Sequence, residues 1–220
     1  MIKLCIFDLD GTLLDTLPTI KHYLNQTLVC YGLSPVDDSK TKRYIGDGAY
    51  QLIYRAFTEQ GITDDETINR ALSEYKAAYD LSPYYLTTYY DGIVEMLDGL
   101  GEKGIALAVL SNKPDAATKA VIAHFFPGTF KIAQGGIDGI PLKPDSTAPL
   151  SIASTLGVKL EDVAFIGDTR VDVLTGVNMG AGISVGVSWG FRDREELISA
   201  GADAVIDHPA ELIALLGVEK

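Results

Sequence analysis

The sequence predicts an α/β fold, in which a doubly wound parallel sheet carries a helical domain inserted after its first strand. Short apolar runs recur along the chain with helical patterns between them, which is typical of parallel sheets covered by helices. The stretch 17–86 interrupts this alternation with helical periodicity alone. Polar residues directly follow several apolar runs, as expected where ligands bind beyond the carboxyl ends of strands.

Strands and helices alternate in the predicted core, which comprises 1–16 and 87–220. The expected strands are 2–7, 105–110, 131–134, 163–166, 183–187 and 204–206. The expected helices are 91–103, 114–125, 147–157, 172–179, 193–200 and 209–216. Crossovers between parallel strands are right-handed, so the helices should cover both faces of the sheet.

The inserted segment 17–86 is predicted to be a separate helical cap. Its first helix has Pro18 in the first turn and an apolar stripe, and two more helices are expected near 48–60 and 64–80. The stripe consists of Ile20, Tyr23, Leu24 and Leu28. All eleven tyrosines of the chain lie between Tyr23 and Tyr90, and most are expected to pack a small core. Linkers are expected near 15–17 and 81–90.

Composition limits the function classes. With 220 residues and 47% hydrophobic content, the chain can bury a core and a smaller companion domain. No apolar run reaches the ~18 residues that span a bilayer, and the N-terminus does not resemble a signal peptide. A membrane partner is therefore not expected. Cys5 and Cys30 are expected to be buried, reduced thiols, which favours a cytoplasmic location.

The formal net charge of −12 disfavours nucleic acid as a partner, because phosphate backbones require a basic surface. A small anionic substrate would have to be attracted by local cations against this overall field. The sequence leaves open whether the protein is a monomer or a homodimer.

The most informative residues are Asp8 and Asp10, which follow the first predicted strand. Alternate residues of a strand point the same way, so both carboxylates should face one site while Leu9 faces the core. Two close carboxylates repel unless a cation or a shared proton relieves them. Mg²⁺ suits this site, because it prefers carboxylate, phosphate and water oxygens.

Three further signals follow later strands. Ser111 and Asn112 precede a predicted helix, whose free N–H groups suit phosphate. Lys143 could offset charge on a phosphate and on a nucleophile. Asp168 ends a strand beside a glycine, which favours metal ligation, and Asp172 falls in the first helical turn, where it could support the metal site indirectly.

Together, in chain order, these residues resemble motifs one to four of the haloacid dehalogenase (HAD) superfamily, and 17–86 resembles its first cap type. Four segments are also similar to the phosphoglycolate phosphatase group. They are Tyr44-Ile45-Gly46-Asp47-Gly48, Ser111-Asn112-Lys113-Pro114, Val187-Ser188-Trp189-Gly190-Phe191-Arg192 and Gly201-Ala202-Asp203-Ala204-Val205-Ile206.

The resemblance implies hydrolysis of a small phosphate ester, best matched by 2-phosphoglycolate. Asp8 would attack phosphorus and form an aspartyl phosphate, while Asp10 would act as general acid and base. Ser111, Asn112 and Lys143 would hold the phosphate. The resemblance also implies a Mg²⁺ held by Asp8, the Asp10 main-chain carbonyl and Asp168, with Asp172 in support.

Several alternatives remain open from the sequence. The same core could serve a hexose-phosphate mutase or a pyrophosphate or nucleotide phosphatase. A dehalogenase would need no second acid, so Asp10 argues against it, and nothing in the sequence marks a cap lysine as the imine-forming residue of a phosphonatase. A non-enzymatic, receiver-like phosphate or metal sensor also clusters aspartates at strand ends, but it needs no long helical insertion. Lys42, Arg43 and Arg55 of the cap are possible contacts for a substrate carboxylate, and a solvated basic surface explains them equally well.

Overall fold

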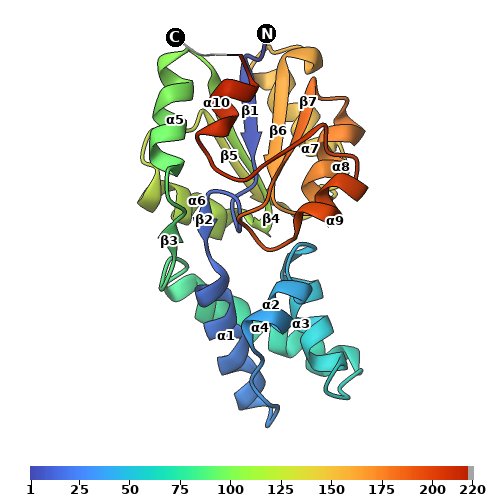
Figure 1. Ribbon diagram of the computed structural model, residues 1–220. Coiled ribbons are helices and arrows are strands. Elements are labelled where there is room, and N and C mark those ends of the chain that lie inside the picture. The colour runs from blue at the N-terminus through green and yellow to red at the C-terminus, as the bar shows by residue number, and fades with distance from the viewer. Residues whose placement is uncertain (218–220) are drawn as a thin grey trace.

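A six-stranded sheet with strand order β5-β4-β1-β6-β7-β8 forms the centre of the computed structural model, which describes residues 1–217 (Figure 1). All neighbouring strands in this sheet are parallel. They are β1 (Leu4–Phe7), β4 (Ala106–Pro114), β5 (Ile132–Gly136), β6 (Val163–Gly167), β7 (Ile183–Val187) and β8 (Ala204–Ile206). The predicted fold class is therefore confirmed.

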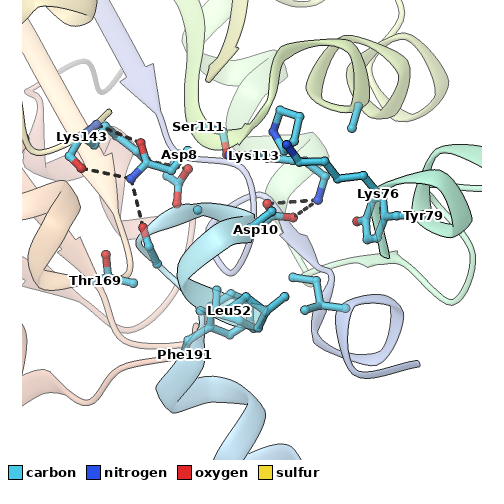
Figure 2. A pocket seen from close by; sticks show the side chains of 18 of the residues that line it. Asp8, Asp10, Leu52, Lys76, Tyr79, Ser111, Lys113, Lys143, Thr169 and Phe191 are labelled. Atoms are coloured by element: carbon cyan, nitrogen blue, oxygen red, sulfur yellow. Dashed lines mark hydrogen bonds and ion pairs between the residues drawn. The ribbon is translucent and has the colours of Figure 1, made fainter. Parts of the chain in front are cut away.

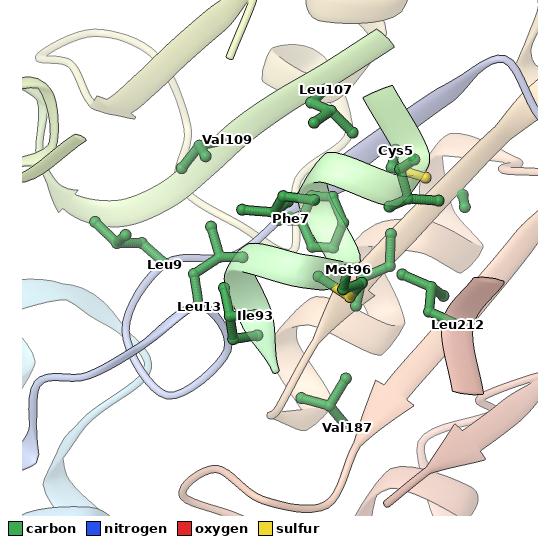
Figure 3. Packing of buried hydrophobic residues seen from close by; sticks show 14 of the residues in the cluster. Cys5, Phe7, Leu9, Leu13, Ile93, Met96, Leu107, Val109, Val187 and Leu212 are labelled. Carbon is green, nitrogen blue, oxygen red and sulfur yellow. The ribbon is translucent and has the colours of Figure 1, made fainter. Parts of the chain in front are cut away.

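Alternating side chains give the sheet two buried faces. Cys5 and Phe7 of β1 pack into one hydrophobic cluster with residues of α5, α6 and α10 (Figure 3), whereas Leu4 and Ile6 pack into a second cluster with residues of α7 and α8. The helices of the core are α5 (Ile93–Glu102), α6 (Asp115–Phe125), α7 (Thr147–Thr155), α8 (Arg170–Met179), α9 (Arg194–Ser199) and α10 (Glu211–Leu215). Helices on both faces make the sheet doubly wound.

The strand order places a ligand crevice beside β1. This strand pairs with β4 on one side and β6 on the other, with Leu4 in register with Ala106 and with Val163. The chain extends the sheet first towards β5 and later in the opposite direction towards β8. Ligands of such sheets bind beyond the carboxyl ends of the strands at this reversal.

Four helices form the cap below the sheet in Figure 1 and share a hydrophobic cluster of their own. They are α1 (Leu17–Cys30), α2 (Asp38–Tyr44), α3 (Gly48–Thr58) and α4 (Asp65–Leu81). Helix α2 was not predicted, because only Thr41 and Tyr44 of its residues are buried and no apolar stripe results. The cluster also includes Ala117 and Phe191 of the core, so cap and core are in apolar contact.

The two connections between cap and core pair with each other as a short antiparallel ribbon. Strands β2 (Leu14–Asp15) and β3 (Thr88–Tyr89) align Leu14 with Tyr89 and Asp15 with Thr88. The sequence predicts only linkers here, because two residues are too few for a strand pattern. The ribbon ties the entry and exit of the cap together (Figure 1).

Two local predictions were wrong. Cys5 is buried as expected, but Cys30 is exposed because it is the last residue of α1. The helix predicted over 114–125 begins one residue later, because Pro114 still belongs to β4 and is the N-cap of α6. Both cysteines are free. None of the helices within residues 1–217 is long and apolar enough to cross a membrane.

Candidate active site

A pocket lies between the carboxyl ends of the strands and the cap, and it encloses about 740 Å³, space open to solvent included (Figure 2). Its polar side consists of Asp8, Asp10, Ser111, Asn112, Lys113, Lys143, Thr169 and Asp172. The cap contributes mainly apolar and aromatic side chains, among them Ile20, Leu52, Tyr75 and Tyr79, together with Lys76 and Asp80. Residues predicted from four separate motifs thus meet in one pocket.

Lys143 lies at the centre of the polar side. Its Nζ is 2.7 Å from Asp8 Oδ1 and donates a 2.6 Å hydrogen bond to Asp172 Oδ1, and the Lys143 side chain is only 3% exposed. Burial alone would lower the pKa of Lys143, but the charges of Asp172 and Asp8 outweigh it and hold the pKa above its usual value. The ammonium therefore stays charged.

Asn112 fixes the position of Lys143. Its Oδ1 accepts a 2.8 Å bond from the Lys143 main-chain N–H, and its Nδ2 donates to Lys143 O at 3.1 Å and to Gly46 O of the cap at 3.0 Å. Both amide hydrogens of the side chain are used, so none is left for a phosphate oxygen. A phosphate contact of Asn112 stays a prediction for its main chain only.

The start of α8 also shapes the site. Thr169 and Asp172 form a capping box, in which Asp172 Oδ2 accepts bonds from Thr169 N at 3.0 Å and Thr169 Oγ1 at 2.7 Å. Asp172 therefore lies in the first helical turn, as the sequence indicated. It caps the helix with one oxygen and binds Lys143 with the other.

Asp168 is fully buried and held on both oxygens. Oδ1 accepts from Thr12 Oγ1 at 2.9 Å, and Oδ2 accepts from the Phe191 main-chain N–H at 2.8 Å. Gly11 has a φ of +88°, and a Cβ atom there would overlap the Asp168 carboxylate. The glycine after Asp10 is thus required both for the turn and for the close approach of Asp168.

The acidic cluster fits a divalent cation. Asp8, Asp168 and Asp172 each have a carboxylate oxygen within 4.8 Å of the others, and all three are buried. Burial, followed by the charge of Asp172, raises the pKa of Asp8 to about 7 against the opposing effect of Lys143. The same two causes raise the pKa of Asp168 well above its usual value. Among the described residues Asp8 Oδ1 has the ion pair with Lys143 but accepts no hydrogen bond, so one lysine is its sole partner and a divalent cation could bind beside it.

The carboxylate of Asp10 points elsewhere in the pocket. Both of its oxygens accept hydrogen bonds from Lys113 Nζ, at 2.9 and 3.1 Å. Because this side chain is held by Lys113, a contribution of Asp10 to a metal would come from its main-chain carbonyl, as the family resemblance implies. The metal role stays a prediction.

The three cap cations suggested by the sequence, Lys42, Arg43 and Arg55, do not line the pocket. Lys42 Nζ donates to Gly190 O at 3.4 Å, and Arg55 binds Tyr44 O at 3.0 Å and also Asp47. The sequence analysis missed Lys113 and Tyr79, which do line the pocket. Lys113 could have been found, because it belongs to the same four-residue motif as Ser111.

This geometry, with buried acids, a lysine and a serine at the strand ends of a doubly wound sheet under a helical cap, defines a class of hydrolase that comparison with known proteins identifies. The family model described as haloacid dehalogenase-like hydrolase matches residues 5–185. The phosphoglycolate phosphatase of Rhodospirillum rubrum is 34% identical over 99% of this chain and 92% of its own length. Phosphoglycolate phosphatase 1 of Pseudomonas aeruginosa is 32% identical over 96% of this chain and 78% of its own length.

Solved structures agree. A crystal structure from Lactobacillus delbrueckii subsp. bulgaricus, provisionally assigned as a phosphoglycolate phosphatase, has a TM-score of 0.91 at 30% identity and covers 98% of both chains. A predicted phosphatase from Clostridium acetobutylicum has a TM-score of 0.86 at 27% identity and covers 100% of both chains.

The chain belongs to the haloacid dehalogenase-like hydrolase family, within its phosphoglycolate phosphatase-like group. It is therefore an enzyme, a hydrolase of the phosphomonoesterase kind, which confirms the class expected from the motifs. The receiver-like alternative does not hold, because the matching family model describes hydrolases and the curated relatives are named as phosphatases.

Proposed function

We propose that this protein is a Mg²⁺-dependent phosphatase that hydrolyses 2-phosphoglycolate through an aspartyl-phosphate intermediate. The observation that carries the proposal is the placement of Lys143 between Asp8 and Asp172, in a pocket that Ser111 also lines. The names of the relatives at about one-third identity support the choice of substrate. The free cysteines are compatible with a reducing, cytoplasmic location, which we include in the proposal.

Each residue has a role in this mechanism. The Asp8 carboxylate attacks phosphorus and forms a covalent bond to it, while the ester oxygen leaves. Asp10 gives its proton to the leaving oxygen and then takes a proton from the water that hydrolyses the intermediate. Lys143 offsets negative charge on the phosphoryl oxygens, and Ser111 Oγ offers a hydrogen bond to one of them.

Asp8, Asp168 and the Asp10 main-chain carbonyl would hold the Mg²⁺, with Asp172 beside them. When bound, the ion would neutralise charge on the phosphate and on the crowded carboxylates. The cap would exclude water from the pocket and select the leaving group.

The test is phosphate release from 2-phosphoglycolate in the presence of Mg²⁺. Asp8→Asn should lower kcat on the order of 10⁴-fold or more, because the nucleophile is lost, while its circular dichroism spectrum matches that of the wild type. Asp98→Asn, an exposed acid on α5, is the matched control and should keep full activity. A wild-type kcat in Asp8→Asn would contradict the covalent route.

A panel of phosphate esters separates the remaining candidates. A mutase would return an isomerised sugar phosphate without free phosphate. A nucleotide or pyrophosphate phosphatase would show its highest kcat/KM on those substrates, and either result would replace 2-phosphoglycolate.

A further inference from the structure

The pocket contains a second cationic position that the phosphoryl chemistry does not use. Lys113 extends from the end of β4, its side chain is 6% exposed, and its Nζ lies 4.6 Å from the centre of the Tyr79 ring. Figure 2 shows Asp10 between Asp8 on one side and Lys113, Lys76 and Tyr79 on the other. Across the pocket, the proposed nucleophile Asp8 is therefore followed by the proposed acid/base Asp10 and then by Lys113.

The two hydrogen bonds of Lys113 do not use all of the N–H donors of its ammonium group. An ammonium has three N–H donors, and the only acceptors that Lys113 Nζ meets within residues 1–217 are the two oxygens of Asp10. A third donor is therefore available on the side of the pocket away from Asp8.

Tyr79 provides an independent observation. Its residue is 4% exposed and lines the pocket, yet its hydroxyl has no hydrogen-bond partner in the part of the chain that the structure describes. A buried hydroxyl without a partner is costly and rare in folded proteins. Burial and then the nearby Asp10 charge raise the pKa of Tyr79 well above its usual value, so the phenol stays protonated and can donate.

On these grounds we propose that Lys113 Nζ and the Tyr79 hydroxyl form an anion subsite for a carboxylate on the carbon next to the ester oxygen of the substrate. The inference rests on the proposed function, because Asp10 must face the ester oxygen for Lys113 to face that carbon. A carboxylate there accepts from both donors and satisfies the Tyr79 hydroxyl. The subsite gives a chain of net charge −12 a local attraction for a dianionic or trianionic small molecule.

The proposed subsite lies in a different place from the cap cations that the sequence suggested as contacts for a substrate carboxylate. Lys42 and Arg55 are engaged with main-chain carbonyls or with Asp47 and lie outside the pocket lining. Lys113 instead comes from the core, and Tyr79 comes from cap helix α4. The subsite is therefore complete only when the cap lies over the core, which links recognition of the leaving group to closure.

The experiment compares two esters, 2-phosphoglycolate and ethyl phosphate, which carries a methyl group in place of the carboxylate. The measured quantity is the ratio of their kcat/KM values, because damage to the chemistry common to both esters cancels in it. The wild type should favour 2-phosphoglycolate. Tyr79→Phe removes only the hydroxyl and should lower the ratio roughly tenfold, and Lys113→Met should lower it by more than about tenfold.

Lys42→Met is the matched control, because this lysine was the rival candidate and lies outside the pocket lining. It should leave the ratio unchanged. Circular dichroism checks that Lys113→Met folds. If this variant does not fold, the ratio measured for Tyr79→Phe still decides whether the subsite exists.

The subsite is overturned if the wild type shows no preference, if Tyr79→Phe keeps the wild-type ratio, or if Lys42→Met alone abolishes it. In each of these cases ethyl phosphate is still hydrolysed, so the proposed phosphatase function survives. Absence of phosphate release from either ester by the wild type would instead overturn the proposed function and the subsite with it.

Discussion

Buried charge at the centre of the site is tolerated because each charged group has a specific partner. Lys143 is bracketed by Asp8 and Asp172, and Asp168 accepts two hydrogen bonds. The three carboxylates nevertheless carry more negative charge than one lysine offsets, and burial with mutual repulsion raises the pKa of Asp8 and of Asp168. This excess of negative charge is the strongest physical reason to expect a cation there.

At the same scale, Mg²⁺ should stabilise the folded protein. A ligand that binds only the native state raises the free energy of unfolding, by about 2.7 kcal/mol when its concentration is a hundred times Kd, and therefore also raises Tm. Saturating Mg²⁺ should therefore raise the Tm of the wild type in a thermal melt, and EDTA should reverse the rise. Asp168→Asn should lose the Mg²⁺-dependent rise, because one of the proposed ligands is removed.

Asp98→Asn is the control for this melt, since Asp98 is exposed and distant in sequence from the cluster. It should keep the full Mg²⁺ effect. A Tm of the wild type that ignores both Mg²⁺ and EDTA would remove the metal from the mechanism.

At the scale of elements, α6 and β5 are joined close to the pocket by Asp115. Its Oδ1 accepts the Gly135 N–H at 2.9 Å, and its Oδ2 accepts from Lys119 Nζ at 2.7 Å. A Cβ at Gly135 would overlap Lys113 O and the Asp115 main chain, so β5 approaches the start of α6 only through a glycine. This contact supports the segment from which Lys113 extends.

Asp115→Ala should lower the free energy of unfolding by about 0.5–1 kcal/mol at pH 7, because the group is partly solvated. Burial tends to raise the pKa of Asp115, but the Gly135 N–H and Lys119 outweigh it, and the net pKa lies below the usual value of 3.8. The charged form is therefore favoured in the folded state. Its contribution is complete above pH 3.8 and disappears as the pH falls through the lower, folded pKa.

Urea unfolding of the wild type and Asp115→Ala at several pH values measures this effect. The difference between them should be constant above about pH 5 and shrink below pH 3.8. A difference that grows on acidification would contradict this expectation.

At the scale of the whole molecule, the cap is held over the core by a few polar bridges. Arg192 of the core donates to Lys42 O at 2.6 Å and to Ile45 O at 2.9 Å in the cap. Asn112 donates to Gly46 O in the same cap loop. Together with the apolar contact of Phe191, these bonds hold the cap against the core beside the pocket that Asp8 lines.

Arg192→Met should raise KM for 2-phosphoglycolate roughly tenfold, because two charge-assisted bonds that favour closure are lost. Steady-state kinetics checks this. Arg194→Met is the control, since its guanidinium binds Asp207 and Val205 within the core, at 2.8 and 2.9 Å. Equal KM values for Arg192→Met and the wild type would show that these bonds do not govern closure.

Much of this protein follows from its sequence alone. Short apolar runs and helical patterns are local properties of the sequence, so they indicated the six strands and the doubly wound core. Strand ends share one edge of a parallel sheet, so the motif residues Asp8, Ser111, Lys143 and Asp168 were expected to converge there. The elements that were missed, α2 and the β2–β3 ribbon, bury too few apolar residues or are too short to leave a pattern.

Only the tertiary structure decided which polar groups meet. The sequence placed Lys113 in a motif but did not show that its ammonium reaches Asp10, and it favoured Lys42 and Arg55, which contact other groups. Tyr79 was one tyrosine of eleven until the fold placed this residue in the pocket lining, with a buried hydroxyl that has no hydrogen-bond partner among the described residues. Side-chain pairing across domains depends on three-dimensional distance and burial, and spacing along the chain encodes neither.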